Sequence, residues 1–62
     1  MANYILGMNN MIYCRVTGGY AWRDDTDENI TPYVMNETEA NWALKHWTKA
    51  CPEEHVYIKK VV

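Results

Sequence analysis

One stretch of the sequence decides the fold: NETEANWALKHWTKA, residues 36–50. Asn36 is a favourable helix N-cap, and Glu39 stands three residues later, as in a capping box. Four apolar residues then repeat at the spacing of one buried helix face: Ala40, Ala43, Leu44 and Trp47. The Cys51-Pro52 pair ends the pattern, because the residue before a proline avoids the helical region. We therefore predict a helix over about residues 37–50.

Short segments with strand character lie on both sides of this helix. They are Ala2–Leu6, Met11–Thr17, Tyr20–Arg23, Ile30–Met35 and His55–Val62. Residues 7–10 separate the first two segments, and Gly18-Gly19 supplies a hairpin turn because glycine accepts positive φ. Pro32 cannot donate to a strand ladder, so its segment is expected at a sheet edge or paired on one side only.

These elements predict an α+β fold. A small antiparallel-rich sheet of about three to five strands should be packed on one face by the single helix. The 62 residues form one domain, 1–62, with limited apolar surface to bury, so we expect a homodimer to add stability.

The aromatic composition is unusual. The chain has no Phe but has five Tyr and three Trp, so every aromatic ring carries a polar group. Such rings suit surfaces that are half buried and half wet, including protein interfaces and ligand pockets.

Charge and hydropathy exclude several function classes. A net charge of −2 argues against general nucleic-acid binding, which normally requires a basic excess. The N-terminal segment lacks the basic start of a signal peptide, and no apolar run approaches the length of a membrane span. We expect a cytoplasmic protein with reduced thiols.

Alternation along the strands predicts two faces of the sheet. Ile12, Cys14 and Val16, with Val56 and Ile58 of the last strand, should pack beneath Leu44 and Trp47. The opposite face should then gather tyrosines and cations: Tyr13, Arg15, Tyr33, His55, Tyr57 and Lys59. Tyrosine rings stack on planar groups, and Arg and Lys bind phosphate or carboxylate. Plain solvent exposure and a subunit interface are the other interpretations of this face.

Three further residues complete the predicted ligand-binding set. Trp42 and His46 stand at i and i+4 on the flank of the helix, where they could border a pocket. Arg23 adds a local cation.

Metal and catalytic motifs are weak. His46, Cys51 and His55 are zinc-ligand types, but no C-x2-C pair accompanies them. The run Asp25-x-Asp27-x-Asn29 begins like a calcium loop, yet Ile30 stands where glycine is needed. No acid–base or nucleophile set is recognisable. We therefore predict no metal, no cofactor and no enzymatic activity.

Three pieces of the chain carry a resemblance at the level of pattern: Gly18-Gly19-Tyr20, residues 34–40 and Val56-Tyr57-Ile58. Together they resemble small phage-encoded accessory proteins, which combine a hairpin, a polar loop, a Thr-Glu-Ala helix and a last strand. Some proteins of this kind counter host defence. They bind a defence protein or sequester a nucleotide-derived signal.

Two functions follow as hypotheses. The first is a non-enzymatic protein that sequesters a nucleotide-like ligand on the predicted Tyr/Arg/Lys face. The alternative is an inhibitor or adaptor that blocks a host protein through the same aromatic residues. In that case the acidic loop, residues 24–28, would steer a basic partner.

Overall fold

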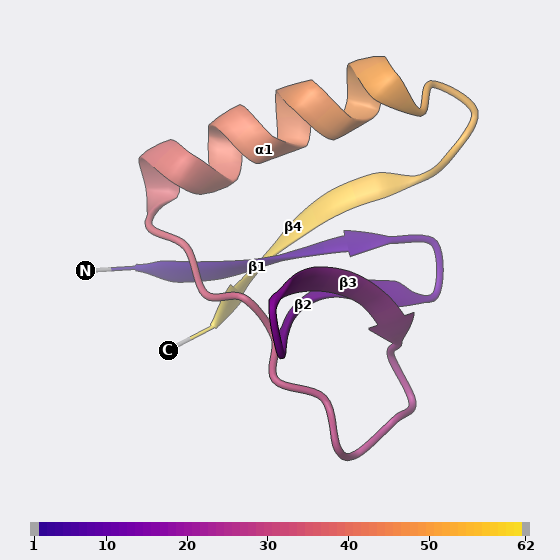
Figure 1. The fold of residues 1–62 in the computed structure, drawn as a ribbon. Helices are drawn as coiled ribbons and strands as arrows, with labels where there is room; N and C mark the ends of the chain where they lie inside the picture. The colour runs from indigo at the N-terminus through magenta and orange to yellow at the C-terminus, as the bar shows by residue number, and fades with distance from the viewer. Residues whose placement is uncertain (1, 62) are drawn as a thin grey trace.

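The chain folds into one four-stranded sheet and one helix (Figure 1). A computed structural model describes residues 2–61. The strands are β1 (Asn3–Met8), β2 (Met11–Val16), β3 (Gly19–Asp24) and β4 (Val56–Val61), and the helix is α1 (Glu37–Ala50). Their order across the sheet is β3-β2-β1-β4, and all neighbours are antiparallel. The predicted α+β fold with a single helix is confirmed.

Helix α1 has the predicted bounds because the predicted capping residues form their hydrogen bonds. The Asn36 side chain accepts a hydrogen bond from the Glu39 backbone N–H at 2.8 Å, and the Glu39 carboxylate accepts one from the Asn36 backbone N–H. At the other end, the Cys51 backbone N–H donates to the Trp47 carbonyl. Ala40 and Ala43 form the most buried part of the helix, as the apolar spacing predicted.

Strands β1 and β2 separate soon after their connecting turn. Only Gly7 with Ile12 and Met8 with Met11 are in register between them. Residues 31–35 occupy the space that opens beyond these pairs. On one side the Tyr33 N–H donates to the Tyr13 carbonyl at 3.0 Å. On the other side, Tyr4 and Met35 exchange two hydrogen bonds of 2.8 Å.

The predicted edge position of Ile30–Met35 is therefore wrong. These residues contact β2 and β1 rather than an outer edge. Pro32 lies opposite Cys14 in an isolated bridge. The hydrogen bonds of this bridge are made by the neighbouring residues, Thr31 and Tyr33, so the N–H that proline lacks is not needed. The segment forms isolated bridges instead of a regular strand.

The core under the helix contains a different set of side chains from the one predicted. Its buried centre is Leu6, Met35, Ala40 and Ala43. Val56 and Ile58 pack against it, as predicted, but so do Tyr13 and Tyr33. The prediction that these two tyrosines lie on the uncovered face is wrong. Tyrosine rings bury more apolar area than the aliphatic residues that alternate with them, so they compete well for this position.

Ile12 and Cys14 are buried on the opposite face of the sheet. Ile12 pairs with Gly7, and the Tyr57 ring packs on Gly7 where a side chain would otherwise lie. Ile12 and Tyr57 therefore share this face of the sheet. Cys14 is two residues further along the same face and is almost fully buried. The thiol of Cys14 donates to the Ile12 carbonyl, and burial raises its pKa, both of which disfavour a reactive thiolate.

The acidic loop after β3 turns back on the side of β2 and β3 away from the helix (Figure 1). It is held by its own side chains: Asp24 accepts from the Thr26 backbone N–H, and Asp27 accepts from the Asn29 backbone N–H. The hydrogen bonds from Thr26 lower the pKa of the Asp24 carboxyl group. The loop and the end of β2 enclose a polar cleft that includes Cys14 and Arg23.

Gly7 lies inside β1 rather than in the predicted break. The strand continues through it to Met8, because the ring of Tyr57 on β4 packs directly on the glycine, where any Cβ would overlap it. The last strand starts one residue later than predicted, at Val56. Its predicted final residue, Val62, lies outside the described residues.

This contact predicts the effect of substituting Gly7. We expect Gly7→Ala to lower the free energy of unfolding by about 1–3 kcal/mol, because the added methyl group displaces the Tyr57 ring. In a Tyr57→Ala background the same substitution should cost little. Urea denaturation of the four proteins of this cycle measures the coupling. An equal penalty in both backgrounds would contradict the assigned contact.

Candidate functional site

Helix α1 covers only half of one sheet face. It contacts β1 and β4, whereas the hairpin of β2 and β3 curves away beside it (Figure 1). On the helix side of this hairpin, Tyr13 stands opposite Trp22 and Arg15 stands opposite Tyr20. The arrangement leaves a groove between the helix and the hairpin, on the same face of the sheet.

Tyr13 is the centre of an aromatic cluster in this groove. Its ring centroid lies 5.1 Å from Trp22, 5.5 Å from Tyr20, 5.9 Å from Trp47 and 6.2 Å from Tyr33. Trp22 and Trp47 meet edge to face at 5.3 Å, which is a favourable aromatic geometry. The cluster therefore joins β2, β3, α1 and the segment 31–35.

The aromatic cluster continues along the exposed side of α1. The His46 ring meets Trp47 edge to face and stacks on Trp42, with centroids 5.0 Å apart and ring planes within 8°. Trp42 nevertheless remains 66% exposed. An indole so accessible and held by a stacking neighbour presents a flat apolar surface at the rim of the groove.

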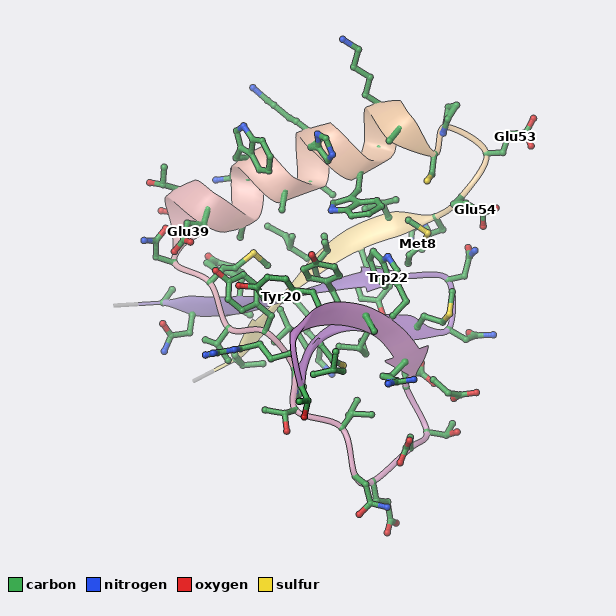
Figure 2. The ribbon with its side chains drawn as sticks, in the orientation of Figure 1. Met8, Tyr20, Trp22, Glu39, Glu53 and Glu54 are labelled. Atoms are coloured by element: carbon green, nitrogen blue, oxygen red, sulfur yellow. The ribbon has the colours of Figure 1, made fainter. Side chains whose placement is uncertain are left out.

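The groove encloses a cavity of about 430 Å³. This volume falls within the range of small-molecule sites in proteins. Figure 2 shows Glu39 at the first turn of α1, above Tyr20 of β3, and Trp22 further along beneath the helix. The cavity is lined by five aromatic and four other residues: Tyr13, Tyr20, Tyr33, Trp42, Trp47, Met35, Thr38, Glu39 and Ala43.

One end of the groove is polar. The Tyr33 hydroxyl donates to Glu39 Oε2 at 3.5 Å, and Glu39 Oε1 lies at the same distance from the Asn36 backbone nitrogen. The Glu39 charge is the main cause that raises the pKa of Tyr33, with burial and Tyr20 adding to it, while the Arg15 charge opposes the shift. A carboxylate and a guanidinium thus both act on the hydroxyl of Tyr33.

The predicted site residues divide between the two faces. Tyr13, Tyr33 and Trp42 line the groove. Arg15 stands opposite Tyr20 and its charge acts on Tyr33, but the cavity that it lines is the polar cleft. His46 stacks on Trp42.

The other four predicted residues do not join the groove. Tyr57 packs on Gly7 on the opposite face, His55 stacks on Tyr57 at 5.5 Å, and Lys59 follows Tyr57 by two residues on the same strand. Arg23 lines the polar cleft near Asp27. The single Tyr/Arg/Lys face that the sequence predicted is therefore wrong, because the helix shares its side of the sheet with the tyrosines of β2 and segment 31–35.

Several groove residues were absent from the predicted set. Tyr20 and Trp22 belong to β3, and Trp47 was predicted to be core only. A hairpin turn was predicted at Gly18-Gly19, but the turn lies one residue earlier, at Thr17-Gly18, because Gly19 pairs with Val16. This shift sets the register that places Trp22 opposite Tyr13 and Tyr20 opposite Arg15. Glu39 was recognised only as a capping residue.

Neither metal chemistry nor a relative identifies the site. Among residues 2–61, no three His, Cys, Asp or Glu side chains gather closely enough to hold a metal ion. Within the same range no helix is long and apolar enough to cross a membrane. Comparison with family models, curated proteins and solved structures finds no match to this chain.

The polar end of the groove predicts how Tyr33 titrates. In the native protein Tyr33 should ionise at higher pH than an ordinary tyrosine, and Glu39→Gln should lower its pKa because the main opposing charge is removed. Tyrosine labelled with ¹³C at Cζ resolves the individual residues by NMR. An unchanged Tyr33 titration in Glu39→Gln would mean that the two side chains do not interact.

Proposed function

We propose that this protein binds and sequesters a nucleotide-derived signal in the groove between α1 and the hairpin of β2 and β3, without catalysis. One observation carries the proposal: a groove of about 430 Å³ is lined by five aromatic residues. Aromatic faces stack on nucleobases of any sequence, and each such stack contributes roughly 1–3 kcal/mol.

The position of the rings supports a flat ligand. Trp42 and Trp47 belong to the helix, whereas Tyr13 and Tyr20 belong to the facing hairpin. Trp47 already contacts Tyr13, so a planar base in the groove would meet the exposed rings, Trp42 of the helix and Tyr20 of the hairpin. Arg15 stands opposite Tyr20, outside the groove lining and in the wall of the polar cleft, where a guanidinium could pair with a phosphate group that extends from the groove.

The proposal assigns no reaction to the groove. Its one carboxylate, Glu39, already serves the helix cap and accepts from Tyr33. The protein would act by lowering the free concentration of its ligand. This mode of action agrees with the resemblance to small phage-encoded accessory proteins that counter host defence.

Inhibition of a host protein is the second candidate. Large exposed apolar side chains support it: Tyr20 is 53% exposed, Val34 50% and Trp42 66%. Aromatic residues of this kind are typical binding hot spots. The acidic loop, however, turns toward the opposite side of β2 and β3 from the groove. A partner that used both features would have to wrap around the hairpin, so ligand binding is the simpler proposal.

A homodimer is part of the proposal, because few side chains are fully buried. Two outer strands, β3 and β4, each have one strand neighbour in the sheet and could pair with another chain. Native mass spectrometry of freshly purified protein should give twice the mass of one chain. A monomer at all micromolar concentrations would rule the dimer out and leave the groove unaffected.

Substitutions on the two faces test the ligand proposal. We expect Trp42→Ala to weaken binding of a nucleoside monophosphate or ADP-ribose by about tenfold, because one stacking surface is lost. Trp42 is largely exposed, so the melting temperature should change little. Lys59→Ala, on the opposite face, is the matched control and should bind like the native protein.

Isothermal titration calorimetry measures all three proteins with each ligand. No binding by the native protein at high micromolar concentration would exclude the proposal. A larger effect of Lys59→Ala than of Trp42→Ala would move the site to the opposite face.

A further inference from the structure

The groove lining carries negative charge and no positive charge. Of the nine residues that line the cavity, Glu39 alone carries a formal charge, and it is negative. The other principal contributors are three tyrosines and two tryptophans, of which Tyr20 and Trp42 are the most exposed. An aromatic face has the negative end of the ring quadrupole, so it attracts cations. The interior of the groove therefore favours a positive group over a neutral or negative one.

The arginine lies outside this lining. Arg15 is the cross-strand neighbour of Tyr20, and its charge lowers the pKa of Tyr33 against the larger effect of Glu39. A ligand that satisfies both regions needs a positive ring inside the groove and an anionic group at its rim. A single molecule that carries both charges would meet the two regions together.

We infer that the groove selects a nucleotide whose base is positively charged, such as a pyridinium or an N-alkylated purine. This inference rests on the proposed function and specifies its ligand. The cationic ring packs on the exposed indole of Trp42, in the same groove as the Glu39 carboxylate. The phosphate group reaches Arg15, which stands opposite Tyr20 outside the groove lining.

The magnitude of the effect can be bounded. A cation over an aromatic face is attracted more strongly than a neutral group of the same shape, and the attraction grows as the cation is desolvated. A cationic ring on Trp42 also has the Glu39 carboxylate in the same groove. We therefore expect a cationic base to bind about tenfold more tightly than its neutral counterpart, which corresponds to about 1.4 kcal/mol.

A matched pair of ligands tests this preference. Nicotinamide mononucleotide has a pyridinium ring, and its reduced form is a neutral ring of similar size on the same ribose phosphate. Calorimetry should give about tenfold tighter binding of the oxidised form. N7-methylguanosine monophosphate and guanosine monophosphate form a second pair, measured at mildly acid pH, where the methylated ring is cationic.

The Glu39→Gln variant tests whether the preference for a cationic base arises in the groove. Glutamine also fits the third helical position of a capping box, so the helix should be retained. The variant should lose several-fold of its affinity for the oxidised nucleotide and keep its affinity for the reduced one. Arg15→Gln is the complementary variant and should weaken both forms by the same factor.

The possible outcomes separate the inference from the proposed function. Equal binding of the two forms of each pair would overturn the cation preference and leave nucleotide binding intact. Absence of binding by every nucleotide would remove both. Trimethyl-lysine binding as tightly as nicotinamide mononucleotide would overturn the nucleotide part, because the groove would then select the cation alone.

Discussion

The architecture depends on the way residues 31–35 insert between β1 and β2. On one side, the Tyr33 N–H donates to β2 at Tyr13, and the Thr31 carbonyl accepts from the Arg15 N–H. On the other side, the paired bonds of Met35 with Tyr4 hold β1. Without this segment, β1 and β2 could continue as an ordinary hairpin and the helix would cover a narrower sheet. With it, β2 and β3 are displaced from the helix, and the aromatic groove opens along the separation.

Residues that cap and anchor the helix also line the groove. Glu39 closes the capping box with Asn36 and at the same time supplies the groove with its carboxylate. Trp47, at the last position of the apolar repeat, contacts the rings of Tyr13 and Trp22. Folding and site formation are therefore coupled: the helix cannot shift without moving the charged and aromatic groups that would meet a ligand.

Local patterns predicted the helix and the order of the elements well. The cap at Asn36 and the repeat from Ala40 to Trp47 act within a few residues, so the sequence displays them directly. Strand alternation also grouped Tyr13 with Arg15, and Tyr57 with Lys59, correctly. It could not decide which group meets the helix.

That decision depends on contacts between distant residues. The packing of Tyr57 on Gly7 fixes one face of β1, and the insertion of residues 31–35 brings Tyr33 beneath the helix rather than to an edge. Both contacts join parts of the chain that are far apart in sequence. The predicted site residues are consequently separated: Tyr13, Tyr33 and Trp42 line one groove, while His55, Tyr57 and Lys59 lie elsewhere.

The central claim is that the β2 tyrosine and the helix tryptophan share one face of the sheet. Nuclear Overhauser effects from the Tyr13 ring protons measure it most directly, since the ring centroids of Tyr13 and Trp47 are 5.9 Å apart. The account predicts strong effects between the Tyr13 ring and the indoles of Trp47 and Trp22. Effects from Tyr13 to the ring of Tyr57, with none to Trp47, would contradict it.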